Sequence, residues 1–353
     1  MRDAKVRAAL EHWAPRFVAQ GVDYNDFART VARVGRWEEW LDAWVATANV
    51  HARLARDAEA QGWRVTAGEA HLQAALCYHF ANFVWMVDKR KHRAAAKKAV
   101  AALRLAHRLL DPTAERIEVP FEKTKMVANL RRPRHDRPPL VILIPGLDST
   151  KEEFFHWENV FLRRGMATLS LDGPGQGETG YKTHIRPDYE VAVRTMLDAL
   201  VPRADLDLGR VGAAGVSLGG YYAPHAAAFE PRIKAVVTVG GPYDFAECWD
   251  GTPSLTRETF RYHAGVRSDT AARKRAALLH LGDVLPRVKQ PFLVVFGKLD
   301  RLIPWQQAER VAAEAPNARL VMYPDGNHVC NNIPYKYRPL VGDWMAETLA
   351  RGG

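Results

Sequence analysis

The sequence predicts an α/β protein with a mostly parallel sheet, preceded by an all-helical domain. Three observations support this. Apolar runs of strand length alternate with helical stretches beyond about residue 114, a glycine-flanked serine turn at 215–219 joins one such run to a helix, and apolar residues before about 113 recur at helical spacing. We therefore expect a helical domain over residues 1–113 and an α/β domain over residues 114–353.

In the helical domain, aromatic and aliphatic side chains form two stripes at helical spacing. The members are Trp37, Trp40, Leu41 and Trp44 in one stripe, and Leu72, Ala75, Leu76, His79, Phe80 and Phe83 in the other. Such stripes are typical of a buried core. Phe80, Phe83 and Trp85 could instead line a pocket, and Asp111-Pro112 ends the last helix.

The second domain begins with an alternating strand pattern at 116–121 and a loop rich in proline and charge at 131–139. Six further strands are predicted, at 140–144, 166–171, 211–215, 234–240, 292–296 and 319–323. Helical stretches separate most of them. Alternation of this kind indicates a mostly parallel sheet that is covered on both faces.

The segment Gly215-Val216-Ser217-Leu218-Gly219-Gly220 follows an apolar run and precedes a helix. A G-x-S-x-G turn between a strand and a helix is typical of a nucleophile elbow, in which glycines leave room for close backbone approach. Ser217 is therefore the candidate nucleophile.

An acid and a histidine follow two later strands. Asp300 lies just after the strand at 292–296, and His328 lies just after the strand at 319–323. The chain order serine, acid, histidine is that of an α/β-hydrolase triad. Asp283 and Asp325 are alternative acids in the same part of the chain.

These residue types suit acyl transfer. A histidine must take the serine proton during attack, and a carboxylate must hold the imidazole in the correct tautomer. We assign these roles to His328 and Asp300. The oxyanion needs two backbone N–H donors, which we place at Leu218 and, in the turn Pro145-Gly146-Leu147-Asp148, at Leu147.

Composition limits the remaining classes. With 353 residues and 47% hydrophobic content, the chain can form two cores. The three cysteines are Cys77, Cys248 and Cys330, and they lack the spacing of a metal site. We expect no metal, no cofactor and no disulfide framework. The sequence shows no secretory leader and no membrane-spanning run, and a cytoplasmic location is expected.

The net charge of +10 raises the question of nucleic-acid binding. No nucleic-acid-reading motif accompanies the charge, and the densest basic run, residues 89–93, has the pattern of a solvated helix face. We expect a small-molecule substrate as the partner, with no nucleic acid and no membrane. A homodimer is compatible with the sequence, which does not determine the oligomeric state.

Three motifs carry a family resemblance: the segment 145–153, the segment Asp172-Gly173-Pro174-Gly175-Gln176-Gly177-Glu178, and the elbow at 215–220. Together they resemble the α/β-hydrolases related to 2,6-dihydroxypseudooxynicotine hydrolase. That resemblance implies a helical lid over the active site, and a group that includes carbon–carbon bond hydrolases, polyketide-shortening hydrolases and esterases. It also implies a functional acid soon after the strand at 234–240, for which Glu247 is the candidate, with Asp244 and Asp250 nearby.

The expected function is a serine hydrolase that works through an acyl-enzyme. Carbon–carbon cleavage in a β-diketone or acyl-phenol needs a proton delivered to carbon, a task that would suit Glu247, whereas ester cleavage needs only a protonated alkoxide. We favour an aromatic or polyketide-like ketone as substrate, with a carboxylester as the alternative. A non-catalytic binding module is the alternative of another class.

Overall fold

The computed structural model describes residues 3–134 and 136–351. The chain divides into two compact units. The helical unit comprises residues 1–114 together with 152–156, and the sheet unit comprises residues 115–151 and 157–353. The short segment 152–156, which the sequence assigned to the α/β domain, thus belongs to the helical unit.

Five α-helices form most of the helical unit. They are α1 (Ala4–Ala19), α2 (Tyr24–Ala32), α3 (Trp40–Ala60), α4 (Arg64–Asn82) and α5 (Lys89–Leu110), with a 3₁₀ turn at Trp37–Glu39. Aspartates begin three of them, because the side chains of Asp3, Asp23 and Asp88 accept backbone N–H groups of the first turn. Such caps satisfy donors that have no partner inside the helix.

The core of the helical unit is aromatic. Phe17 of α1 stacks on Phe80 of α4 with ring centroids 4.0 Å apart, and Trp44 of α3 stacks on Phe17 at 5.1 Å. The indole N–H of Trp40 donates to the carbonyl of Phe80, and that of Trp85 donates to the carbonyl of Trp37. The aromatic residues of both predicted stripes are buried, and therefore form core.

A buried carboxylate, Glu153, is held by polar groups of the helical unit. Arg16 donates to it through Nε and Nη2 at 3.1 and 2.7 Å, Gln20 at 2.9 Å, and the His79 Nε2 lies 2.7 Å away. Burial raises the pKa of Glu153, but the charge of Arg16 and the hydrogen bond with His79 outweigh it and lower the pKa to about 2. Glu153 is therefore an ionised, paired group in the interior.

The sheet unit contains an eight-stranded sheet in the order β1-β2-β4-β3-β5-β6-β7-β8. β1 and β2 pair antiparallel, as do β2 and β4, and all other neighbours are parallel. The strands are β1 (Glu115–Phe121), β2 (Thr124–Arg131), β3 (Pro139–Ile144), β4 (Ala167–Asp172), β5 (Asp207–Val216), β6 (Ile233–Val239), β7 (Phe292–Gly297) and β8 (Ala318–Tyr323). The predicted mostly parallel sheet is confirmed.

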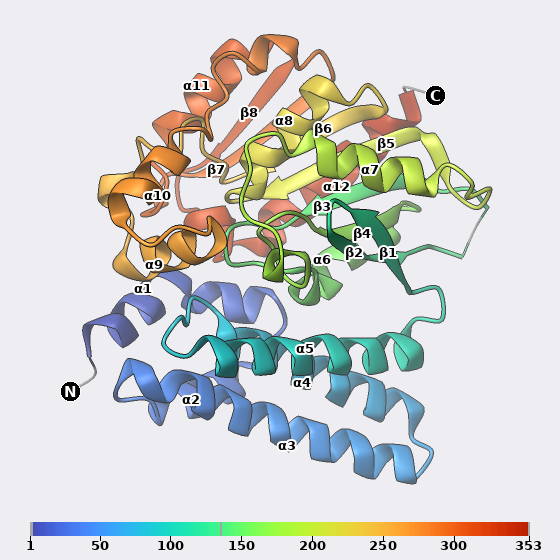
Figure 1. Ribbon diagram of the computed structural model, residues 1–353. Coiled ribbons are helices and arrows are strands. Elements are labelled where there is room, and N and C mark those ends of the chain that lie inside the picture. The colour runs from blue at the N-terminus through green and yellow to red at the C-terminus, as the bar shows by residue number, and fades with distance from the viewer. Residues whose placement is uncertain (1–2, 135, 352–353) are drawn as a thin grey trace. The chain divides into compact units, whose positions relative to one another are not determined.

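Helices cover both faces of this sheet, with α7 and α8 in front of it and α12 behind it in the view of Figure 1. The small Gly212 of β5 lets Met345 of α12 approach the sheet, and Gly342 of α12 lies against Val160 of α6. The helices are α6 (Phe155–Leu162), α7 (Glu190–Leu200), α8 (Gly219–Phe229), α9 (Ser254–His263), α10 (Asp269–Ala276), α11 (Gln306–Glu314) and α12 (Pro334–Arg351). Five 3₁₀ turns accompany them, at Lys151–Glu153, Thr179–Tyr181, Trp249–Gly251, Leu285–Arg287 and His328–Cys330.

The central strands are buried on both sides because they consist almost wholly of valine, isoleucine, leucine, alanine and phenylalanine. Their carboxyl ends meet at one edge of the sheet, where the loops after β3, β4, β5, β7 and β8 lie. In an open parallel sheet this edge is where ligands bind. Among the described helices, none has the length and apolar character needed to cross a membrane.

We expect Glu153→Gln to lower the free energy of unfolding by about 3–5 kcal/mol at pH 7, because it removes the buried anion that pairs with Arg16 and accepts from Gln20. The folded pKa of Glu153 lies below its unfolded value, so its contribution is present above about pH 4.5 and is lost as the pH falls toward 2. Denaturant unfolding at several pH values should show the difference between wild type and variant shrinking over that interval. A constant difference would contradict the assignment.

Candidate active site

Ser217 lies at the sharp turn between β5 and α8, with a backbone φ of 53°. A non-glycine residue rarely adopts this left-handed conformation, so the turn is strained. Glycines make the turn feasible. A Cβ on Gly215 would lie 1.8 Å from the carbonyl oxygen of Gly219, and a Cβ on Gly219 would lie 2.1 Å from that of Ile144. The structure therefore has the backbone of a nucleophile elbow.

The three side chains expected to form a triad are hydrogen-bonded in sequence. His328 Nε2 lies 2.9 Å from Ser217 Oγ, and His328 Nδ1 lies 2.7 Å from Asp300 Oδ2. The carboxylate accepts, so Nδ1 carries the proton and Nε2 is left to accept the serine hydroxyl proton. The side chain of Asp300 is fully buried, and that of His328 is nearly so.

Asp300 is itself held in place by the chain that follows it. Its second oxygen, Oδ1, accepts the backbone N–H groups of Leu302 and Ile303 at 2.8 and 3.0 Å. The two alternative acids lie elsewhere, since Asp325 pairs with Lys336 on the surface and Asp283 is exposed. Of the three acids considered from the sequence, Asp300 is the one bonded to His328.

The predicted oxyanion donors lie beside Ser217. Gly146 packs so closely on Ser217 that a Cβ added to it would lie 3.0 Å from the serine Cβ and 3.4 Å from Oγ. Leu147 and Leu218 are buried, and among the residues that the structure describes no hydrogen bond engages the backbone N–H of either. Buried N–H groups are nearly always paired, so two donors held free beside a serine are suited to an anion that forms there.

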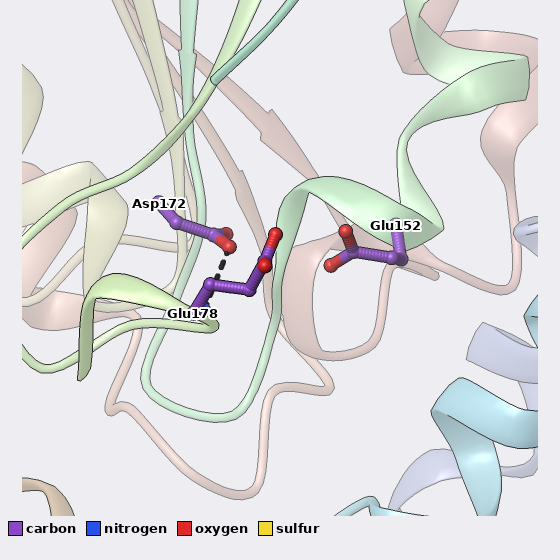
Figure 2. Close-up of side chains that lie close together, drawn as sticks. All are labelled: Glu152, Asp172 and Glu178. Carbon is purple, nitrogen blue, oxygen red and sulfur yellow. Dashed lines mark hydrogen bonds between the residues drawn. The ribbon is translucent and has the colours of Figure 1, made fainter. Parts of the chain in front are cut away.

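The loop after β4 forms a charged cluster near the same edge. Lys151 is fully buried, its Nζ lies 2.7 Å from Asp172 and 2.8 Å from Glu178, and its backbone N–H donates to Asp172. Figure 2 shows Asp172 and Glu178 side by side, with the Glu178 N–H bonded to the Asp172 carboxylate. Arg116 donates to both oxygens of Glu178.

This arrangement determines the charge of the cluster. Burial raises the pKa of Glu178, but the charge of Lys151 and the hydrogen bonds from Arg116 and Lys151 lower it to about 2. Carboxylates of this kind can ligate metal ions, but the ammonium of Lys151 already lies between Asp172 and Glu178. The pair is therefore neutralised by the protein's own cations.

Glu247, the further acid expected from the family resemblance, is exposed and lies after β6. Both of its oxygens accept from Arg310, at 2.8 and 2.7 Å, and one also accepts from Gln307 at 2.8 Å. Asp244 caps the same segment by accepting the N–H of Ala246. The structure thus brings Ser217, His328 and Asp300 together, and bonds Glu247 to other partners.

Two residues to which the sequence assigned no role contribute to this edge. Lys151 and Gln176 lie within motifs that carried the family resemblance, and both are buried and bonded to the turns around the triad. Lysine and glutamine are mostly exposed in proteins, so no signal in the sequence around Lys151 or Gln176 indicated that they are buried.

The comparisons with known proteins agree with this fold. Residues 20–252 match the family described as "FrsA-like: Esterase FrsA-like". The chain is 36% identical over 343 residues to 2,6-dihydropseudooxynicotine hydrolase of Paenarthrobacter nicotinovorans, covering 96% of this chain and 92% of that protein. It is also 36% identical to 20-hydroxy-prefusarin hydrolase FUS2 of Gibberella moniliformis, over 65% of this chain and 58% of that one.

Solved structures show the same architecture. The crystal structure of the 2,6-dihydroxy-pseudo-oxynicotine hydrolase has a TM-score of 0.88 and 34% identity, with 96% of each chain covered. AbyA5 has a TM-score of 0.77 at 20% identity over 99% of each chain, which indicates a shared fold alone. The α/β-hydrolase fold and the family resemblance expected from the sequence are both confirmed. The lid role of the helical domain stays a prediction.

We expect Gly219→Ala to impair both folding and reactivity, because its Cβ would press on the carbonyl oxygens of Ile144 and Pro145 at 2.1 and 2.6 Å. Overpacking of this kind costs about 1–3 kcal/mol. Thermal unfolding and the rate of Ser217 labelling by a fluorophosphonate measure the two effects. Gly251→Ala is the matched control, since no atom lies within 4 Å of its added Cβ. Equal behaviour of the two variants would contradict the packing argument.

Proposed function

The chain belongs to the FrsA-like esterase family of α/β-hydrolases, and we propose that it is a serine hydrolase that forms an acyl-enzyme through Ser217. The observation that carries the proposal is the hydrogen-bond chain from Ser217 through His328 to Asp300. Nucleophile, base and orienting acid within hydrogen-bond distance are the arrangement that activates a serine hydroxyl.

The proposed reaction has two halves. Ser217 Oγ attacks the carbonyl carbon of the substrate while the serine proton passes to His328 Nε2. The oxyanion that forms accepts hydrogen bonds from the backbone N–H groups of Leu147 and Leu218. Collapse of the tetrahedral intermediate expels the leaving group, which takes the proton from His328. Water, deprotonated by the same histidine, then attacks the acyl-enzyme and releases the acid and Ser217.

For the bond that is broken, we favour carbon–carbon cleavage in an aromatic or polyketide-like ketone. The resemblance to the 2,6-dihydroxypseudooxynicotine hydrolase group, which includes carbon–carbon bond hydrolases, supports this choice. Two relatives at 36% identity are named as hydrolases of 2,6-dihydropseudooxynicotine and 20-hydroxy-prefusarin. Carboxylester hydrolysis is the alternative, favoured by the esterase description of the family.

Cleavage of a carbon–carbon bond needs an acid that protonates the carbon of the leaving group. The imidazolium of His328 is one source, because Nε2 is 2.9 Å from the serine oxygen and holds the proton after attack. Glu247 is the other source expected from the sequence, but its carboxylate is exposed and bonded to Arg310 and Gln307. The geometry favours His328, and proton delivery by Glu247 stays a prediction.

We expect wild type to cleave aryl ketones, tested as β-diketones and acyl-phenols, in a panel matched with aryl esters. Ser217→Ala should lower kcat by about 10⁶-fold and Asp300→Asn by about 10⁴-fold, as in other triads. Mass spectrometry of the products identifies the bond broken. Cleavage of esters alone would make the protein an esterase.

If wild type cleaves no ketone and no ester of this panel, the alternative that the protein is a non-catalytic binding module must be tested. Fluorophosphonate labelling of Ser217 then separates a hydrolase with an untried substrate from a binding module, because labelling requires an activated serine. Absence of labelling in folded wild type would favour the binding module and overturn the proposed function.

The Glu247 role has its own test. If Glu247 delivers the proton to carbon, Glu247→Gln lowers kcat for ketones and leaves kcat for aryl esters unchanged, because only the carbon leaving group needs the extra acid. If the glutamate serves only its ion pair, Arg310→Met produces the same small change as Glu247→Gln on both substrate classes. Full activity of Glu247→Gln on every cleaved ketone would exclude the role in proton delivery.

A further inference from the structure

We propose that Gln176 is a positioning residue for the oxyanion-binding turn, and that it orients the peptide whose N–H belongs to Leu147. The inference rests on the proposed function, since it concerns how that site binds the oxyanion. Gln176 lies in the loop after β4 and its side chain is almost completely buried.

The side-chain amide of Gln176 is engaged on both of its atoms. Nε2 donates to the carbonyl oxygens of Pro145 at 2.5 Å and Gly146 at 3.3 Å. Oε1 accepts from the backbone N–H of Gly173 at 3.0 Å and from the Tyr189 hydroxyl at 2.7 Å. A carbonyl only accepts and an NH₂ only donates to these partners, so the orientation of the amide is determined.

The contact with Gly146 bears directly on the oxyanion donor. The carbonyl of Gly146 and the N–H of Leu147 belong to one peptide group, which is planar and trans. In a trans peptide these two groups point in opposite directions, so a donor that holds the carbonyl also determines where the N–H points. A hydrogen bond to the carbonyl further polarises the peptide and strengthens its N–H as a donor.

The groups that accept from or donate to Gln176 are themselves buried and closely packed. Tyr189 is fully buried and stacks on Tyr222 with ring centroids 4.2 Å apart. Gly173 has no side chain, and a Cβ there would lie 2.3 Å from the Tyr189 hydroxyl. The tyrosine hydroxyl therefore reaches Gln176 only because residue 173 is a glycine.

The same loop also holds the far end of the turn. Asp172 accepts hydrogen bonds from both the backbone N–H and the Nζ of Lys151. Lys151 lies six residues after Pro145, whose carbonyl accepts from Gln176. The turn from 145 to 151 is thus bonded at both ends to the loop 172–178. Lys151 secures the backbone, whereas Gln176 acts on the peptide that carries the donor.

The test compares wild type with Gln176→Leu and Gln176→Glu. The leucine removes the donor, and the glutamate keeps the shape but places acceptor oxygens against the carbonyls of Pro145 and Gly146. Tyr189→Phe keeps the amide and removes one of its two anchors. Gln290→Leu is the control, because Gln290 also donates to a backbone carbonyl, that of Ala227, at the opposite end of the strands.

We expect Gln176→Leu and Gln176→Glu to lower kcat for an aryl ester by about 10–100-fold with KM changed less than about twofold, because a misaligned donor loses only part of what a deleted one loses. The rate of Ser217 labelling by a fluorophosphonate and the affinity for an aryl trifluoromethyl ketone, which forms an oxyanion on the serine, should fall in parallel. Tyr189→Phe should show a smaller loss, and Gln290→Leu should match wild type.

The outcomes separate this inference from the proposed function. If wild type is neither labelled by the fluorophosphonate nor turns over any substrate, both the proposed function and the role of Gln176 are overturned. If wild type is active and the two Gln176 variants keep its kcat and its affinity for the aryl trifluoromethyl ketone, the role of Gln176 is overturned and the proposed function stands. The same holds for a loss that tracks only the unfolded fraction seen by thermal unfolding, or a rise in KM at constant kcat, because a misdirected oxyanion donor would produce neither pattern.

Discussion

The close approach of three backbone segments around Ser217 is the constraint on which the site depends. The left-handed turn at Ser217 brings Gly215 within van der Waals contact of Gly219, and Gly219 against the end of β3. A side chain at Gly215 would clash with Gly219 inside the turn that carries Ser217, and a side chain at Gly219 would clash with Ile144 and Pro145 at the end of β3. The cost of the strained turn is met by the surrounding parallel sheet, whose buried strands hold both segments in place.

Several polar groups near Ser217 are buried, and they differ in whether they have a hydrogen-bond partner. The N–H groups of Leu147 and Leu218 have no acceptor among the described residues, while Gln176, which donates to the carbonyls of Pro145 and Gly146, is bonded through both atoms of its amide. Under the proposed mechanism, an anion that forms at Ser217 would meet donors that need no rearrangement, which is the condition for strong electrostatic stabilisation. In the neighbouring cluster, Lys151 pairs with Asp172 and Glu178, and Arg116 pairs with Glu178, so these two carboxylates are balanced by the protein's own cations.

The sequence was sufficient to predict those features that depend on local residue patterns and on the order of residues along the chain. The apolar strands, the glycines of the elbow and the order of Ser217, Asp300 and His328 all follow from periodicity and spacing. It did not predict features that depend on distant segments: the antiparallel strand β2, the membership of residues 152–156 in the helical unit, and the burial of Lys151 and Gln176. Glu247 was selected by family resemblance, and its partner Arg310 is 63 residues away, beyond the reach of local reasoning.

The most direct measurement is rapid quenching of a single turnover of an acyl-phenol or β-diketone, followed by peptide mass spectrometry. If Ser217 forms the acyl-enzyme, an acyl group derived from the carbonyl side of the cleaved bond is expected on the peptide that contains Ser217, and its accumulation and decay should match product formation. Product formed at full rate without any adduct on Ser217, or with the adduct on another residue, would contradict the proposed acyl-enzyme.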